Sequence, residues 1–289
     1  MDGKGASANP AEEARKPRRV KEPSILALYA GYRVSLMPTT SWNPITVFLT
    51  FVGEITLLLL DVIRRLLRPP IEVREIVQQM AFIGVASVPI VLLTSFFSGA
   101  VLSLYSSEFM VKYGATQFIG ATVALSMARE IAPVLAGIMV AARCGSAMAA
   151  QVASMEVTEQ IDALRMLSVN PTSYLVIPRV IAAVFMLPIL GLIGIYAGVV
   201  GGYLVAVSGG VPGSAFLQSI QQYAQPWDFM GGVIKTPVFG LITALVACQQ
   251  GLRTENGAVG VGRATTNTVV IAMLLIYIAN YFLAAILFR

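Results

Sequence analysis

The chain lacks histidine, has only two cysteines and has few charged side chains, and each shortage excludes a class of function. Without histidine there is no His-ligated zinc, haem or di-iron site and no Ser-His-Asp triad. Cys144 and Cys248 stand in apolar surroundings far apart in the sequence, so we expect packing residues and not a disulfide. No G-x-x-x-x-G-K-S/T run occurs, so ATP would have to be bound by a partner subunit, and no cofactor is expected in this chain.

Charge is scarce because the chain is mostly apolar. Charged residues make up 12% of the 289 residues and hydrophobic residues 56%, whereas a soluble domain carries about 25% charged residues. A bilayer crossing needs about 20 predominantly apolar residues. The sequence predicts an all-α integral membrane protein with five transmembrane helices, over about 81–105, 116–141, 180–207, 229–252 and 265–288.

The basic residues indicate how these spans are oriented. With the N-terminus in the cytoplasm, the segments 1–80, 142–179 and 253–264 hold sixteen of the twenty Lys and Arg residues, as the positive-inside rule requires. Five spans then place the C-terminus outside. The net charge of +5 therefore does not indicate a nucleic-acid partner. We expect residues 1–44 to form a largely disordered cytoplasmic tail and residues 45–289 to form one membrane domain.

Residues 45–68 are apolar but interrupted by acids. Glu54, Asp61, Arg65 and Arg68 are spaced so that they share one helical face, which makes the helix amphipathic. Such a helix prefers to lie in the plane of the membrane interface. The alternative is a first span whose two acids face inward.

Three charged residues fall inside predicted spans. Arg129 and Glu130 lie midway along the second span and Lys235 lies in the fourth; Asn280 in the fifth is a weaker candidate of the same kind. A charge near the bilayer centre costs about 2.5–3.5 kcal/mol, so these groups either line a polar cavity or pair. One interpretation is a cavity that meets a lipid headgroup or another charged substrate. The other is a structural ion pair, for example Glu130 with Lys235.

The segment 146–168 is predicted to be a cytoplasmic helix between the second and third spans. Glu156, Glu159 and Asp162 follow at three-residue spacing and would line one side of it, with apolar residues on another. A helix resting on the membrane would place these acids against anionic headgroups, which is unfavourable. Docking onto a partner is therefore the preferred interpretation.

Glycines recur every four residues in the third span. Gly194, Gly198 and Gly202 form two overlapping G-x-x-x-G repeats, which permit close approach of another helix. The neighbour could belong to this chain or to a second copy.

Two long motifs are similar to a known family. Residues 125–182, which begin LSMAREIAPVLAG, resemble the central signature of the MlaE/YrbE permeases, and GVGRATTNTVV at 260–270 resembles their C-terminal signature. The resemblance covers about 45–289. It implies an amphipathic interfacial helix, five spans and a cytoplasmic coupling helix, within the membrane subunit of an ABC-type lipid transporter in the inner membrane.

The resemblance also implies partners and sites. Such permeases form a homodimer flanked by two ATPase subunits, with a ring of MCE-domain protein on the periplasmic side and lipid in a cavity at the dimer interface. Arg129, Glu130 and Lys235 would then lie at the cavity, and residues 156–162 on the coupling helix. An acid is expected in some relatives where Asn280 stands. The chain itself would not be an enzyme.

Two other classes of protein compete with this interpretation. An ion- or proton-coupled secondary transporter would use Arg129, Glu130 and Lys235 as a relay, but no clear inverted repeat is visible in the sequence. A membrane-embedded enzyme is disfavoured because no nucleophile–base pair or metal-ligand cluster is apparent.

Overall fold

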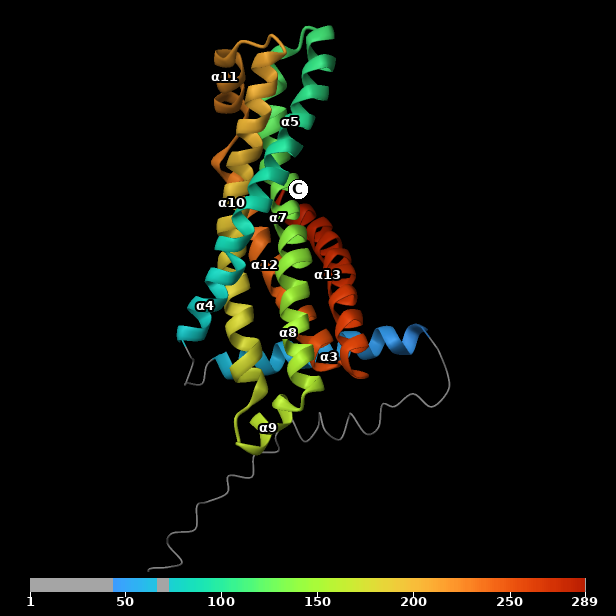
Figure 1. The fold of residues 1–289 in the computed structure, drawn as a ribbon. Coiled ribbons are helices and arrows are strands. Elements are labelled where there is room, and N and C mark those ends of the chain that lie inside the picture. Colours follow the sequence, from blue (N-terminus) through green and yellow to red (C-terminus); the bar gives the residue numbers. More distant parts are fainter. Residues whose placement is uncertain (1–43, 67–72, 289) are drawn as a thin grey trace, which may run out of the picture. The chain divides into compact units, whose positions relative to one another are not determined.

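The computed structural model describes residues 44–66 and 73–288, nearly all of them helical (Figure 1). The predicted tail lies outside the described residues except for Pro44, and so does Arg68. The chain divides into residues 1–49 and 50–289, and the helix bundle belongs to the second of these units. Five helices in the described part are long and apolar enough to cross a membrane, which confirms the predicted fold class. They run Val73–Lys112, Thr116–Val157, Thr172–Ser208, Pro226–Leu252 and Gly257–Leu287.

Three of the five contain local irregularities. The first consists of α4 (Val73–Ile83), a 3₁₀ turn and α5 (Val88–Lys112). The second joins α6 (Ile119–Ser126), α7 (Ala132–Val140) and α8 (Ser146–Val157) through the π-helical segments η3 (Met127–Ile131) and η4 (Ala141–Gly145). In the third, the π-helical η5 (Thr172–Val176) leads into α10 (Ile177–Ser208). After α10 come α11 (Gly213–Tyr223), α12 (Pro226–Leu252) and α13 (Gly257–Leu287).

The glycine repeats of α10 pack against helices of the same chain. A Cβ on Gly194 would meet the Ser95 hydroxyl of α5 at 2.9 Å, and one on Gly202 would meet Val123 of α6 at 2.6 Å. Gly198 lies against Gly99 of α5, where a Cβ on Gly99 would be 2.8 Å from the Cα of Gly198. Of the two neighbours that the sequence allowed, the three glycines therefore contact helices of their own chain.

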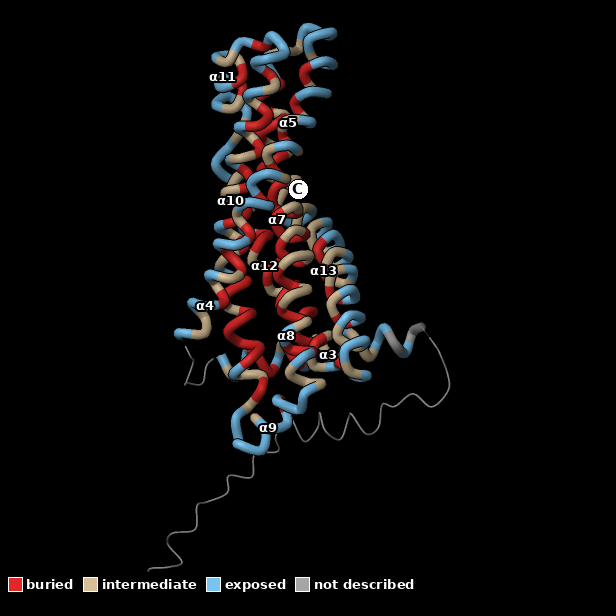
Figure 2. The backbone as a smooth tube through the Cα atoms, viewed as in Figure 1, coloured by how far each residue is buried: buried red, intermediate tan, exposed pale blue. Residues whose placement is uncertain are grey.

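The core of the bundle surrounds α12. This helix packs against α8, α10 and α13, and buried positions concentrate where these helices meet (Figure 2). Its glycines allow this, because Gly232 approaches the backbone of Ala128 and Gly240 that of Ala183. By contrast, α13 is the least buried of the five long helices, and large apolar side chains on it remain exposed: Val270, Leu274, Tyr277, Ile278, Tyr281, Phe282 and Ile286.

Helix α3 (Pro44–Leu66) corresponds to the helix predicted over 45–68 and is amphipathic. Leu58, Val62 and Asp61 are buried. Glu54 accepts a hydrogen bond of 2.6 Å from Gln249 at the end of α12, and Arg253 lies 3.6 Å from the same carboxylate. The polar face is thus turned toward the bundle. α3 is not one of the five spans found within the described residues, and its position in the interface plane stays a prediction.

The segment 146–168 differs from the single helix that the sequence predicted. Helix α8 continues the second long helix to Val157, and a separate helix, α9 (Gln160–Met166), follows after a corner at Glu159. Glu159 has a left-handed backbone with φ of 60°, a conformation that is uncommon outside glycine and asparagine. Because of this corner, Glu156, Glu159 and Asp162 do not share one helix face. Hydrophobic periodicity does not reveal such a corner.

Candidate functional site

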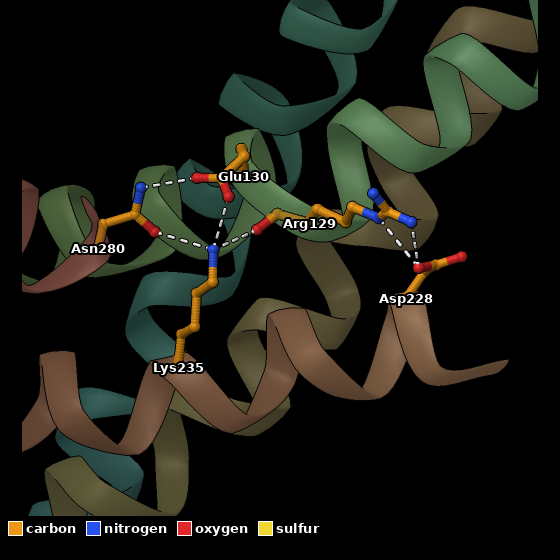
Figure 3. A network of polar contacts seen from close by, with 5 residues as sticks. All are labelled: Arg129, Glu130, Asp228, Lys235 and Asn280. Atoms are coloured by element: carbon orange, nitrogen blue, oxygen red, sulfur yellow. Dashed lines mark hydrogen bonds and ion pairs between the residues drawn. The ribbon is translucent and has the colours of Figure 1, made fainter. Parts of the chain in front are cut away.

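The predicted intramembrane polar residues come together around Lys235 (Figure 3). The Lys235 side chain is fully buried, and its ammonium lies 2.7 Å from Glu130 Oε1. It also donates to the Arg129 carbonyl at 2.7 Å and to Asn280 Oδ1 at 3.2 Å. Three acceptors match the three donors of an ammonium group. The pairing of Glu130 with Lys235, one of the two interpretations of the sequence, is therefore formed.

Asn280 completes the network from α13. Its Nδ2 donates to Glu130 Oε2 at 2.7 Å, while its Oδ1 accepts from Lys235. An ionised acid at this position could accept from Lys235 but could not donate to Glu130. The amide therefore leaves Glu130 as the carboxylate that neutralises Lys235.

The Arg129 side chain points away from Lys235, toward Asp228 at the start of α12 (Figure 3). Its Nε and Nη2 donate to the same Asp228 Oδ1 at 2.9 and 2.6 Å. The side chains of Arg129 and Glu130 are 40% and 43% exposed, whereas those of Asp228 and Lys235 are 5% and 0% exposed. The site is thus neutral as a whole but presents one cation and one anion on its open side.

Asp228 was not among the site residues predicted from the sequence. This residue also caps α12, because its Oδ2 accepts from the Gln225 backbone N–H at 2.8 Å. A signal was present: Gln225-Pro226-Trp227-Asp228 has proline at the first helical position and an acid at the third, the pattern of a helix start. The loop before it carries no charge, so Asp228 is the first acid at this end of the fourth span and a natural partner for a cation inside the membrane.

Phe288 is a second residue that the sequence did not identify. Its ring centre lies 5.0 Å from both the Arg129 guanidinium and the Lys235 ammonium, within cation–π range. Near it, Trp227 Nε1 donates to the Leu287 carbonyl at 3.4 Å. The end of α13 therefore packs beside the start of α12 and covers part of the network.

Neighbouring residues of one helix serve different partners here. Arg129 and Glu130 are successive residues of the π-helical segment η3, and successive side chains of a helix point in directions about 100° apart. Such single-turn π segments are frequent at functional sites. Whether the network binds a substrate stays a prediction.

The end of the bundle that carries α9, opposite α11 (Figure 1), is a second candidate site. Glu159 and Asp162 are exposed there, and Asp162 pairs with Arg165. Met166 and Leu167 are 87% and 74% exposed. Glu156, at the end of α8, is only half-buried. The tip, defined here as residues 156–169, combines acidic and apolar side chains, which suits docking of another protein.

Neither site resembles a metal centre. Within residues 44–66 and 73–288, no group of three or more His, Cys, Asp or Glu side chains is placed to hold a metal ion.

Comparison with known proteins identifies the family of the chain. A family model described as Permease MlaE matches residues 76–286. The chain is similar to a probable ABC transporter permease protein of Rickettsia felis, 45% identical over 84% of this chain and 94% of the relative. A Synechocystis protein of the same description is 42% identical over 79% and 88%. The Arabidopsis thaliana chloroplast protein TRIGALACTOSYLDIACYLGLYCEROL 1 is 34% identical over 88% and 72%. A match of this extent shows that the chain belongs to the MlaE permease family.

Proposed function

We propose that this multi-pass permease subunit moves phospholipid or a related lipid between the inner membrane and a periplasmic MCE-domain protein, driven by an ABC ATPase. The observation that carries the proposal is a half-exposed polar network set in an otherwise apolar helix bundle. A membrane lipid needs both kinds of surface. The family supports a transport role, and the Arabidopsis relative bears the name of a glycolipid.

The geometry suggests how a headgroup is held. Arg129 binds Asp228 through Nε and Nη2, which leaves Nη1 on the half-exposed side for a phosphate oxygen. The exposed apolar face of α13 offers a surface for acyl chains. The chain makes and breaks no covalent bond. Transport would follow from different lipid affinities in two conformations that ATP binding in the partner interconverts.

The proposed assembly contains further subunits. An ABC permease works with an ATPase, which we place at the tip because its acids and exposed apolar side chains suit a protein contact. A second copy of the permease and the MCE-domain protein are proposed from the family resemblance. The tip would then face the cytoplasm and the α11 end the periplasm.

The first test of this function is purification of the chain from its native membrane in mild detergent, followed by mass spectrometry. Recovery of an ATPase, an MCE-domain protein and bound phospholipid is the expected result. A chain that arrives stable and alone, without ATPase or lipid, would instead favour ion-coupled transport through the same network.

Charge reversal at the tip should weaken binding of the ATPase. Glu159→Lys replaces an exposed acid and keeps a Cβ, so the left-handed backbone is equally unfavourable in both proteins. We expect recovery of the ATPase in a pull-down to fall about tenfold, the effect of losing roughly 1.4 kcal/mol of binding. Gln222→Lys, at the opposite end, is the control. Unchanged recovery of the ATPase with Glu159→Lys would show that the tip is not part of the interface with the ATPase.

Cysteine labelling tests the orientation. Both native cysteines are buried, so single cysteines at the exposed positions Ser168 and Gln222 report on the two ends of the bundle. In intact cells a membrane-impermeant maleimide should label position 222 and leave position 168 unlabelled until the membrane is opened. Labelling of position 168 in intact cells would show that the tip faces the outside, opposite to the proposed orientation.

A further inference from the structure

A second arginine lies on the same long helix as Arg129, nearer the tip. Arg143 belongs to the π-helical segment η4, as Arg129 belongs to η3. The fourteen steps from Arg129 to Arg143 correspond to about 21 Å along a helix that rises 1.5 Å per residue. Arg143 is half-buried. The sequence prediction puts it just beyond the cytoplasmic end of the second span.

The contacts of Arg143 are few and long. Its Nη1 lies 3.3 Å from Ser87 Oγ and 3.5 Å from Cys144 Sγ, and its guanidinium is 5.9 Å from the centre of the Phe82 ring. The first of these exceeds the usual N–H···O range. In the part of the chain that the structure describes, no carboxylate forms an ion pair with it.

Other buried or half-buried cations of the bundle are better satisfied. Lys235 and Arg129 each have a carboxylate within 2.7 Å. Arg179, buried near the tip, donates to the Leu175 carbonyl at 2.6 Å and to Gln151, and only its Nε lacks an acceptor. Arg143 therefore keeps most of its five donors available, next to a buried serine hydroxyl that shares a 3.2 Å contact with Cys144.

An apolar strip leads along the helix to Arg143. Ile131, Leu135, Met139 and Arg143 follow at four-residue spacing, so they lie on one side of the helix, and all four are half-exposed. The three residues that precede Arg143 in this series are apolar. The helix thus presents an apolar strip that ends at the Arg143 guanidinium, whereas Arg129 precedes Ile131 by two residues and points to a different side of the helix.

From this geometry we infer that Arg143 and Ser87 bind the phosphate of a lipid headgroup at the tip-side end of this strip. The inference rests on the proposed lipid function and adds to it a second headgroup station. Arg143 donates charge-assisted hydrogen bonds to the phosphate oxygens, and the Ser87 hydroxyl donates once its contact with Cys144 is exchanged. The ligand chemistry required is a phosphate group, and a lipid is distinguished from free phosphate by experiment.

Photolabelling of the full-length protein tests the inference. The probe is a phosphatidylethanolamine with a diazirine on its headgroup, added to protein in nanodiscs, with labelled peptides mapped by mass spectrometry. We expect labelling of two regions, one around residues 82–90 and 139–147 and the other around 227–235. Excess phosphatidylglycerol should displace the first label, while diacylglycerol, which has no phosphate, should not.

Substitutions then assign the label to Arg143. Arg143→Gln should reduce labelling of the first region about tenfold, since one charge-assisted contact is lost, and leave the second region unchanged, which also reports an intact fold. Arg143→Lys should fall between the two because it keeps the charge but not the fork of donors. Lys112→Gln, which removes an exposed charge at the other end, is the control.

The outcomes separate the two proposals. Labelling of the second region alone, or equal labelling in wild type and Arg143→Gln, overturns the Arg143 station and leaves the proposed function standing. Absence of label from both regions contradicts the lipid function itself. Displacement of the first label by inorganic phosphate but not by phosphatidylglycerol would show that the site takes a soluble anion, which also overturns the inference.

Discussion

Glu130→Ala is expected to destabilise the protein by about 3 kcal/mol and to abolish lipid transport. The substitution leaves Lys235, which is fully buried, without its carboxylate, and removing one partner of a buried ion pair typically costs about 3–5 kcal/mol. We expect the lower end because the Arg129 carbonyl and Asn280 still accept from the ammonium. Thermal unfolding in detergent measures the first effect, and lipid transfer in proteoliposomes with the partner proteins measures the second.

A double variant separates structure from function. Glu130→Ala combined with Lys235→Met removes both charges, and replacing a buried pair by apolar side chains is often neutral or stabilising. Stability should therefore return to near that of wild type, while transport should remain lost because two of the four charged groups of the proposed headgroup site are gone. Recovery of transport together with stability would show that the Glu130–Lys235 pair serves only the packing of the helices.

Gly99→Ala is expected to be among the most damaging single-methyl changes in the helix bundle. The added Cβ would lie 2.6 Å from the carbonyl carbon and 2.8 Å from the Cα of Gly198. Both are backbone atoms, so no side chain can move aside, and α5 and α10 must separate along their contact. Overpacking of this kind costs about 1–3 kcal/mol and occasionally more. We expect about 3 kcal/mol, measured as a lowered unfolding temperature.

The matched control is Gly262→Ala. Gly262 is also helical, but a Cβ there would meet no atom within 4 Å. Alanine is favoured over glycine in a helix interior by up to about 1 kcal/mol, so this variant should be neutral or slightly more stable. If both alanine variants lose stability equally, the close contact between α5 and α10 would not explain the first result.

The sequence predicted the parts of the structure that depend on chain-wide composition or on the cost of charge in lipid. Apolar runs located the long helices, although each helix extends beyond its predicted span because polar turns at a helix end are still helical. The cost of burying Arg129, Glu130 and Lys235 predicted that they would pair or line a cavity. The structure joins Glu130 to Lys235 and Arg129 to Asp228.

What the sequence did not predict depends on local backbone geometry or on tertiary distance. The corner depends on a left-handed backbone at Glu159, and because this residue is neither glycine nor asparagine, the sequence carries no signal for it. Arg129 pairs with Asp228, which is 99 positions away in the sequence. The sequence around Asp228 indicates the start of a helix, but it does not indicate this ion pair. The four-residue glycine pattern of α10 indicated close packing, but only the three-dimensional contacts show that α5 is the neighbour.

The two π-helical segments of the second long helix can each absorb one residue. A π turn holds one residue more than an α turn, so the helix on either side keeps nearly the direction it would have without that residue. Thr116–Val157 runs from the α11 end to the tip, so the direction in which the tip points depends on the register of this helix. Deleting Ala141 within η4 would let the segment become α-helical and leave α8 and α9 in nearly the same direction, whereas deleting one residue from α7 would turn them by about 100°. A gap of one residue in an alignment is therefore a neutral length variation at a π segment and a change of docking direction elsewhere in this helix.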